Sequence, residues 1–274
     1  MRKEKVVSEV ILLGTGAAPG VPALAFGFGD CDPNNPKNFR MRTSTYLDIN
    51  GVHILIDTSP DLRMQLINNN IRSLDAVLYT HVHADHLHGI DDLREINRIS
   101  RNSVELFASA FTLSVIRERF SYLLVNDHEK FNPIYCAALH PNTFEFDKSF
   151  DIKGVKITPI ELYGHPVETT GYIFNDGEVV YIADFLSINE DSLKHIKYRP
   201  EVLVMPLTTP DGAHYHANLD QLMHYVRLIN PKRFVTNHMG VECDYEALSA
   251  RLHELQPNTD SELLVGYDGM RFEI

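Results

Sequence analysis

Short apolar stretches alternate with turn residues along the first third of the chain, and their length is typical of strands. Many of their residues are β-branched or aromatic, which favours extended backbone. Asn50-Gly51 separates two of these stretches and is a strong signal for a hairpin with a type I′ turn. The strands predicted in this part of the chain are Val6–Leu13, Thr43–Ile49, Val52–Ile56, Leu74–Thr80 and Val104–Phe107.

The same apolar pattern returns after residue 150, where strands begin to alternate with helical stretches. Further strands are predicted at Val155–Leu162, Thr170–Phe174, Val179–Ile182, Val202–Pro206, Arg233–Thr236 and Leu263–Gly266. Helices are predicted at Asp61–Asn69, Asp91–Ile99, Thr112–Arg119, Leu219–Ile229 and Tyr245–Leu255. Strands in both halves with helices outside them indicate an α/β fold in which two mixed β-sheets pack face to face under helices, an αββα sandwich of four layers.

Residues Ser121–Phe146 interrupt this pattern, because they show no clear periodicity and carry aromatic, proline and histidine residues. Such a stretch is typical of a binding loop or lid, and equally of a plain surface insertion. Elsewhere no repeat, linker or low-complexity tract divides the sequence. We therefore expect one domain that covers residues 1–274.

The composition limits the partners of this protein. Of its 274 residues, 44% are hydrophobic, which is enough for a substantial core. The net charge of −12 argues against a nucleic-acid partner and an anionic membrane surface, since both attract clustered Lys and Arg. No apolar stretch approaches the roughly 20 residues that span a bilayer, so no membrane association is expected. Three widely spaced cysteines show no disulfide or zinc pattern, and the expected location is cytoplasmic.

The glycines of "LLGTGAAPG" follow a predicted strand and invite comparison with a dinucleotide-binding loop. The third glycine comes one position late, however, and Pro19 and Pro22 disfavour the helix that such a loop should open. Gly14 and Gly16 are better explained by a tight strand-to-loop turn whose glycines let the backbone approach something closely, as a loop near the rim of an active site would.

A dense group of histidines, "YTHVHADHLHG", directly follows the predicted strand Leu74–Thr80. His81, His83, Asp85 and His86 stand at positions i, i+2, i+4 and i+5, which spread around a helix but share one side of an extended loop. Imidazole and carboxylate groups suit zinc, manganese or iron. The pattern therefore predicts a loop at the end of a strand that presents several metal ligands to one point, with His88 left without a role.

The motif H-x-H-x-D-H after a short apolar strand resembles that of the metallo-β-lactamase fold superfamily. Nearly the whole chain is similar to one branch of it, which contains the cyclic phosphodiesterase of phosphonate breakdown. The matching stretches are "LLGTGAAPGVP" (Leu12–Pro22), "RTSTYLDI" (Arg42–Ile49), "LIDTSPDLRMQL" (Leu55–Leu66), "THVHADHLHGIDDLR" (Thr80–Arg94), "HYHANLDQ" (His214–Gln221) and "YDGMRFEI" (Tyr267–Ile274).

The resemblance implies a complete set of ligands for two divalent ions, Zn²⁺ or Mn²⁺. The first ion would be held by His81, His83 and His165 and the second by Asp85, His86 and His238, with Asp184 bridging them. It also implies that a histidine of "HYHANL" protonates the leaving group, and His216 fits this role better than His214. Asp57 is a candidate to orient a ligand imidazole, with helix capping as the equal alternative.

One part of the chain departs from that branch. Its enzymes often hold a separate structural zinc through several cysteines after the glycine loop and a histidine three residues beyond the last ligand. Here only Cys31 and, in place of that histidine, Val241 are found. We therefore expect no structural zinc, and a loop Ala23–Arg40 that is held by packing or by a partner subunit.

These features predict a binuclear metal-dependent hydrolase, most plainly a phosphodiesterase that acts on a small, in some cases cyclic, phosphodiester. Water bridging two such ions loses its proton near neutral pH and becomes the nucleophile. Asp85 and Asp184 would act through the ions that they hold, and His216 as general acid. The alternatives are a hydrolase of a thioester, a lactone or the 3′ end of tRNA, and a metal-binding accessory protein. Members of the branch often form dimers, so a homodimer is one expected state.

Overall fold

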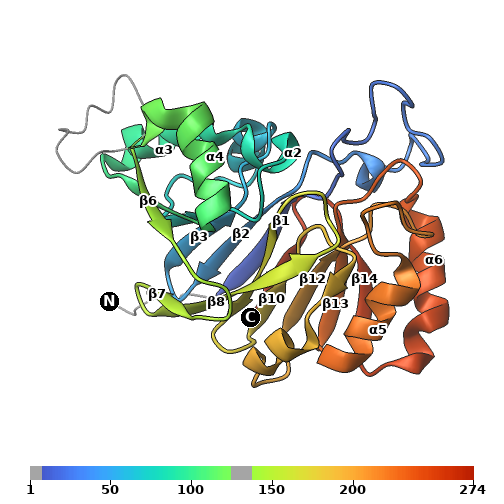
Figure 1. Ribbon diagram of the computed structural model, residues 1–274. Coiled ribbons are helices and arrows are strands. Elements are labelled where there is room, and N and C mark those ends of the chain that lie inside the picture. The colour runs from blue at the N-terminus through green and yellow to red at the C-terminus, as the bar shows by residue number, and fades with distance from the viewer. Residues whose placement is uncertain (1–7, 125–137) are drawn as a thin grey trace, which may run out of the picture.

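The computed structural model describes residues 8–124 and 138–274, and its centre is a pair of β-sheets packed face to face (Figure 1). The first sheet has the strand order β15-β1-β2-β3-β4-β5-β6. Neighbouring strands are antiparallel from β15 to β3 and parallel from β3 to β6, which makes the sheet mixed. Its strands are β1 (Glu9–Gly14), β2 (Ser44–Ile49), β3 (Val52–Ile56), β4 (Ala76–Leu78), β5 (Val104–Ala108), β6 (Leu139–Thr143) and β15 (Arg271–Glu273).

The second sheet repeats this design, with the order β11-β8-β9-β10-β12-β13-β14 and β7 paired to β8. Its strands are antiparallel from β11 to β10 and parallel from β10 to β14. They span β7 (Phe150–Ile152), β8 (Val155–Tyr163), β9 (Thr169–Phe174), β10 (Val179–Tyr181), β11 (Ser187–Ile188), β12 (Val202–Pro206), β13 (Arg233–Asn237) and β14 (Glu262–Val265).

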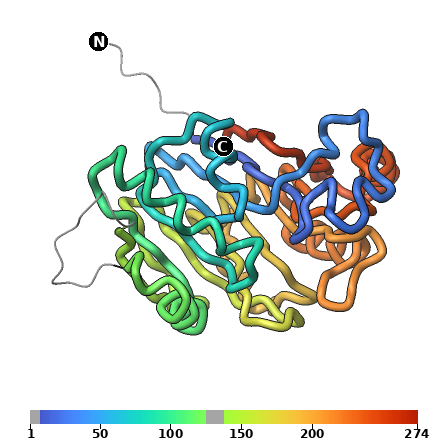
Figure 2. Tube along the Cα trace, turned by 90° about the horizontal axis from the view of Figure 1, so that it is seen from above, coloured from blue at the N-terminus to red at the C-terminus, as the bar shows by residue number. Residues whose placement is uncertain are grey.

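Helices cover the outer face of each sheet, and Figure 2 shows the two groups on opposite sides of the molecule. The first sheet carries α1 (Leu62–Asn68), α2 (Ala84–Leu87), α3 (Leu93–Ser100) and α4 (Ala110–Phe120). The second carries α5 (Leu219–Ile229) and α6 (Tyr245–Leu255). Short 3₁₀ helices lie at Pro36–Asn38, Ile90–Asp92, Ser121–Leu123, Glu190–His195 and Gln256–Asn258.

Strand β1 shows how the sequence produces these layers. Val10 and Leu12 belong to the core cluster that includes both sheets, whereas Ile11 and Leu13 belong to the cluster under the helices of the first sheet. Successive side chains of a strand point to opposite faces, so a strand that is apolar at every position packs on both sides. The predicted four-layer α/β sandwich is thereby confirmed.

The predicted elements are found with end shifts of a few residues, and the hairpin at Asn50-Gly51 is confirmed by positive φ angles of 55° and 82°. The sequence did not reveal α2 or four short strands, β6, β7, β11 and β15. Strand β6, "LHPNT", is polar and contains a proline, and it lies at the edge of the sheet where such residues are tolerated. Residues 1–7 of the first predicted strand and 125–137 of the Ser121–Phe146 stretch lie outside the described residues.

Glycines near the end of β1 permit the close approach that the sequence predicted. A Cβ atom on Gly14 would stand 2.1 Å from the Arg42 carbonyl oxygen, and one on Gly16 would stand 2.9 Å from that of Arg40. The interpretation as a tight turn with a close backbone approach is therefore confirmed. The turn brings the backbone of Arg40 and Arg42 against the end of β1. Arg40 is the last residue of the segment Ala23–Arg40, which is called the 23–40 loop below.

The 23–40 loop is held by contacts within the chain itself. The Asp244 carboxylate accepts hydrogen bonds from the Asp32 amide at 3.1 Å and the Asn38 side chain at 2.7 Å. Lys37 donates to the Tyr245 hydroxyl at 2.9 Å and lies over that ring. The loop is thus bonded to the start of α6, and the expectation that packing holds it is confirmed. In the described residues we find no helix with the length and apolarity to cross a bilayer.

Candidate metal centre

The histidine-rich motif lies at the carboxyl end of β4. His81 and His83 extend from the strand end, and His83 is the N-cap of the one-turn helix α2. Asp85 and His86 lie on that helix, so the motif is extended only in its first half. This corrects the expectation of a continuous loop: the helical turn places His86 beside His81, with ring centroids 4.1 Å apart, and directs Asp85 toward His238.

Three further strand ends supply the later residues. His165 lies in the turn between β8 and β9, Asp184 follows β10, and His238 follows β13 with a left-handed φ of 51°. The carboxyl ends of the parallel strands β4, β10 and β13 meet at one edge of the sandwich, and side chains after them converge there.

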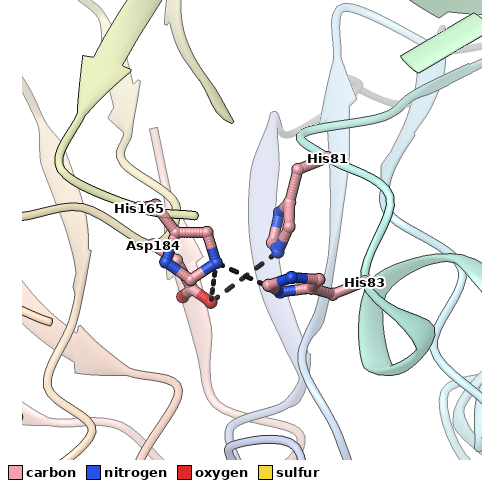
Figure 3. Close-up of side chains that lie close together, drawn as sticks. All are labelled: His81, His83, His165 and Asp184. Carbon is pink, nitrogen blue, oxygen red and sulfur yellow. Dashed lines mark hydrogen bonds and ion pairs between the residues drawn. The ribbon is translucent and has the colours of Figure 1, made fainter. Parts of the chain in front are cut away.

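The first group that this edge brings together is His81, His83, His165 and Asp184, whose nearest nitrogen and oxygen atoms all lie within 4.8 Å of one another (Figure 3). The Nε2 atom of His81 lies 3.8 Å from Asp184 Oδ2, and that of His165 lies 3.9 Å from the same oxygen. His165 Nε2 is also 3.1 Å from His83 Nδ1. Three imidazoles and a carboxylate around one point could hold a divalent ion.

The second group is Asp85, His86 and His238, which meet the same 4.8 Å criterion. Asp85 Oδ2 lies 3.3 Å from His86 Nε2 and 3.2 Å from His238 Nε2. Asp184 Oδ2 is 3.7 Å and 3.4 Å from these two nitrogens. One carboxylate oxygen of Asp184 therefore faces both groups. This is the arrangement needed to bridge two ions.

Asp57 controls the orientation of one imidazole in each group. Its fully buried carboxylate accepts a hydrogen bond from the Thr80 hydroxyl at 2.7 Å and lies 2.7 Å from His86 Nδ1. Since the single hydroxyl proton of Thr80 goes to Asp57, that hydroxyl must accept from His81 Nδ1, 2.9 Å away. Both imidazoles then carry their proton on Nδ1 and direct the Nε2 lone pair into the cluster. The helix-capping alternative for Asp57 has no support, because Asp61 is the N-cap of α1.

The donor atoms of the cluster fit a cation. Among the described side chains, His81 Nε2, His86 Nε2 and Asp184 Oδ1 are buried and have no hydrogen-bond partner. Buried polar atoms are rarely left without a partner, so three of them on residues of one cluster fit a site for a cation. Burial also lowers the pKa of His81, and it lowers that of His165 to about 4, which keeps both imidazoles neutral and able to coordinate.

The acidic residues of the cluster are ionised. Burial by itself would raise the pKa of Asp85, but His86 and His238 outweigh it and hold that pKa well below its usual range. The pKa of Asp184 is likewise lowered by His238, His86 and His216 against the opposing effect of burial. Two carboxylates with neutral or cationic imidazoles around them present the negative charge that a pair of divalent ions requires.

The segment "HYHANL" places one of its two histidines at the cluster. His216 stacks on His238 with ring centroids 5.6 Å apart, and its nitrogen lies within 4.8 Å of donor atoms of Asp184 and His238. Its Nδ1 atom is buried without a partner. His214 is exposed and lies beside Tyr215 instead. Burial lowers the pKa of His216, so its imidazole is neutral near neutral pH. It must take up a proton before it can act as a general acid.

The remaining histidine of the motif, His88, ends α2 and packs on Phe120 with centroids 5.9 Å apart, away from the cluster. Arg42, near the glycine loop, forms a 2.6 Å ion pair with Asp61. These two residues have structural contacts of their own. Sequence reasoning missed Thr80 and Thr208, whose hydroxyls lie within hydrogen-bond distance of the imidazoles of His81 and His238. Neither a threonine that precedes a histidine nor one 30 residues away from it carries a recognisable signal by itself.

Comparison with known proteins identifies the class. Residues 53–239 match the family model described as a β-lactamase superfamily domain, and the chain belongs to that family. A crystal structure of a diphosphatase from the PhnP family is similar over 97% of this chain and 98% of its own, with 26% identity and a TM-score of 0.81. The Zn²⁺-bound PqqB of Methylobacterium extorquens has the same fold, with 18% identity, a TM-score of 0.73 and coverage of 97% and 100%.

A curated relative adds a different activity. An octanoyltransferase of Porphyromonas gingivalis is 28% identical over 262 residues, which is 95% of this chain and 50% of that protein. The chain thus spans about half the length of this relative. Together the comparisons show a metallo-β-lactamase fold with a PhnP-like neighbour, and a hydrolase family whose centre binds metal.

Proposed function

We propose that this protein is a binuclear metal-dependent phosphodiesterase that hydrolyses small phosphodiesters, cyclic ones included. The observation that carries the proposal is the pair of ligand groups that share one oxygen of Asp184. In the proposed centre His81, His83 and His165 hold one ion, Asp85, His86 and His238 hold the other, and Asp184 bridges them. Zinc and manganese both suit this set of nitrogen and oxygen donors.

Two divalent ions bound here would supply an activated water and neutralise charge on the phosphoryl group. The residues of the chain have the remaining tasks. Asp57 keeps the Nε2 lone pairs of His81 and His86 directed into the cluster, and the carboxylates of Asp85 and Asp184 supply the negative charge that would hold the ions. His216, beside Asp184 and His238, is placed to give a proton to the leaving alkoxide.

Similarity to the PhnP-family diphosphatase supports phosphorus–oxygen bond cleavage over other hydrolyses. A net charge of −12 speaks against a large polyanion such as tRNA, because few cations remain to contact its backbone. A small phosphodiester needs no such surface, since the ions themselves attract it. A cytoplasmic location and a homodimer remain predictions.

Hydrolysis by the metal-loaded protein tests this proposal. Bis-p-nitrophenyl phosphate and a panel of cyclic phosphates should be cleaved, and chelation should abolish the reaction. His216→Ala should lower kcat by about 10²- to 10⁴-fold with unchanged metal content, whereas His214→Ala, two residues earlier and exposed, should leave kcat unaltered. A His216→Ala protein that loses metal as well would show that His216 is a ligand and not the acid.

A second candidate is the hydrolysis of an acyl thioester, which the 28% identical octanoyltransferase favours. The same ligand groups would serve it, because an attacked carbonyl also develops negative charge on oxygen. Octanoyl thioesters therefore belong in the same panel as the phosphodiesters. Rapid cleavage of these, with every phosphodiester left intact, would replace the first proposal by the second.

A further inference from the structure

Outside the His–Asp cluster, the guanidinium group of Arg40 is buried and donates hydrogen bonds to four neutral acceptors. The residue is 3% exposed. Its Nη1 donates to the Gly240 carbonyl at 3.3 Å and to Cys31 Sγ at 3.7 Å. Its Nη2 donates to the Cys243 carbonyl at 2.6 Å and to Asn38 Oδ1 at 3.1 Å. Asp268 and Arg40 line one surface cavity, and Arg40 counteracts the rise in the pKa of the Asp268 carboxyl that burial causes. A buried charge is costly even with such a neighbour, so a packing role alone would be met better by an apolar side chain.

The acceptors of Arg40 belong to two segments that are far apart in the sequence. Cys31 and Asn38 lie in the 23–40 loop, whereas Gly240 and Cys243 lie in the turn between β13 and α6. The guanidinium is planar and presents its donors in a fixed geometry, so it sets the spacing between those segments as well as joining them. The Asp30 amide, which donates to the Val241 carbonyl at 3.0 Å, runs in parallel with this link.

The turn that Arg40 grips begins with His238. That histidine has a left-handed φ of 51°, a conformation which costs energy for a residue with a Cβ and must be imposed by neighbouring contacts. On one side the Met239 amide donates to the Thr15 carbonyl at 2.7 Å. On the other side, the Gly240 N–H donates to the Thr208 carbonyl oxygen, and the Gly240 carbonyl oxygen accepts a hydrogen bond from Arg40. The orientation of the His238 ring therefore depends on where the Gly240 peptide is held.

We propose that Arg40 is a positioning residue for His238, a built-in cation that holds the Gly240 peptide so that His238 Nε2 faces Asp85 and Asp184. These contacts are 3.2 Å and 3.4 Å long. The proposal rests on the proposed function in so far as His238 serves as a ligand. It goes further, because it predicts that loss of Arg40 weakens the Asp85–His86–His238 group and spares His81, His83 and His165.

A matched control exists at the start of β13, the strand that His238 follows. Arg233 begins β13, at the end opposite to His238, and it also donates to backbone carbonyls, those of Glu201 at 3.2 Å and Glu273 at 2.8 Å. Arg233→Met therefore removes a comparable set of bonds from β13 without touching the turn after His238. Arg40→Met and Arg233→Met should both lower the melting temperature, and only the first should change the metal centre.

Equilibrium titration of the metal-free protein with Zn²⁺ and with Mn²⁺ tests the first readout. Arg40→Met should weaken the second of two binding steps by about 10- to 100-fold and leave the first step as in the wild type. Arg233→Met should leave both steps unaltered. Two unaltered binding steps in Arg40→Met would overturn the proposal.

Chemical rescue separates the guanidinium group from general packing. Arg40 lines a surface cavity of about 400 Å³, so added guanidinium ion has a route to the space that Arg40→Ala would create. Millimolar guanidinium should restore the second binding step of Arg40→Ala and should not alter Arg233→Ala. Failure of rescue, with the variant still folded by circular dichroism, counts against the proposal.

The final readout does not depend on metal. In the ¹H–¹⁵N spectrum of metal-free protein, the ring signals of His238, assigned with His238→Gln, should shift in Arg40→Met and stay in place in Arg233→Met. An unshifted His238 ring in Arg40→Met would overturn the role of Arg40. A wild-type protein that binds fewer than two ions, with the His238 ring still shifted in Arg40→Met, would instead overturn the proposed binuclear centre and retain this role for Arg40.

Discussion

Two polar clusters join distant parts of this chain, and they differ in where their positive charge comes from. The His–Asp cluster gathers two ionised carboxylates and several imidazoles, with buried atoms that lack partners among the described residues. The cluster around Arg40 gathers neutral carbonyl, amide and sulfur acceptors about a covalently attached guanidinium. Under the proposed function the first is complete only when ions are supplied from solution, whereas the second has its cation in the folded chain. Stability and activity should therefore respond to metal at the first cluster only.

The largest effect is expected from the carboxylate that both ligand groups share. Asp184→Asn removes the negative charge that lies 3.4 to 3.9 Å from four imidazoles. Hydrolysis should fall on the order of 1,000-fold because neither ion is then held in its catalytic position. Elemental analysis should show fewer than two ions per chain. Full activity with two ions bound would contradict the bridging role.

Removal of metal should separate the two clusters directly. A ligand present at about 1,000 times its Kd stabilises the native state by about 4 kcal/mol, and chelation removes this contribution. Thermal unfolding with and without chelator measures the loss. Hydrogen exchange at the amides of the 23–40 loop should stay unchanged in native conditions, because Arg40, Lys37 and Asp244 hold that loop without an ion. Faster exchange of the loop on chelation would show that the second cluster also depends on metal.

The difference between the clusters also explains what the sequence could reveal. A cluster that recruits an ion must use the few side chains that coordinate metals, so His81, His83, Asp85 and His86 stand out at their spacing, and strand ends locate the others. Two of the four acceptors of Arg40 are backbone carbonyls, which every residue has, and nothing in "NFRMR" distinguishes it from a surface arginine.

The fold followed the same division. Strands such as β12, "VLVMP", are apolar at every position and were predicted because burial on both faces determines their sequence. Strand β15 has three residues, two of them exposed, and pairs only at the edge with β1. Long-range pairing creates such a strand, so its own sequence contains no pattern to predict. Helix α2 escaped prediction because its single turn is occupied by metal-ligand candidates.

A smaller effect is expected at the residue that orients imidazoles in both ligand groups. Asp57→Ala leaves the Nδ1 proton of His86 without its acceptor. It also releases the Thr80 hydroxyl proton from Asp57, so that this hydroxyl need no longer accept from His81 Nδ1. Metal affinity should fall about 10- to 100-fold, as is usual for such outer contacts. Asp61→Ala is the control, because that residue lies on the same loop and pairs with Arg42. Equal affinities of the two variants, measured by metal titration, would show that Asp57 is dispensable.

The smallest effect concerns Asp268, a titratable carboxyl next to the glycine loop. It accepts hydrogen bonds from Thr15 and from the Met41 amide, and burial raises its pKa to about 6. A carboxyl whose pKa is higher in the folded state than in the unfolded state, where it is about 3.9, binds its proton more tightly when folded. Its contribution to stability is therefore complete below about pH 4 and is lost as the pH rises through 6.

Asp268→Asn removes this titration and should flatten part of the pH profile. Urea unfolding of the metal-free proteins is the measurement, because metal binding then does not contribute to the free energy of unfolding. The free energy of unfolding of the wild type, relative to Asp268→Asn, should fall by on the order of 1 to 2 kcal/mol between pH 4.5 and pH 7, less than the full shift implies because the side chain keeps some solvent contact. Parallel profiles for the two proteins would show that Asp268 stays ionised throughout. The stability of the loop beside Arg40 would then be independent of the titration of Asp268, as it is expected to be independent of metal.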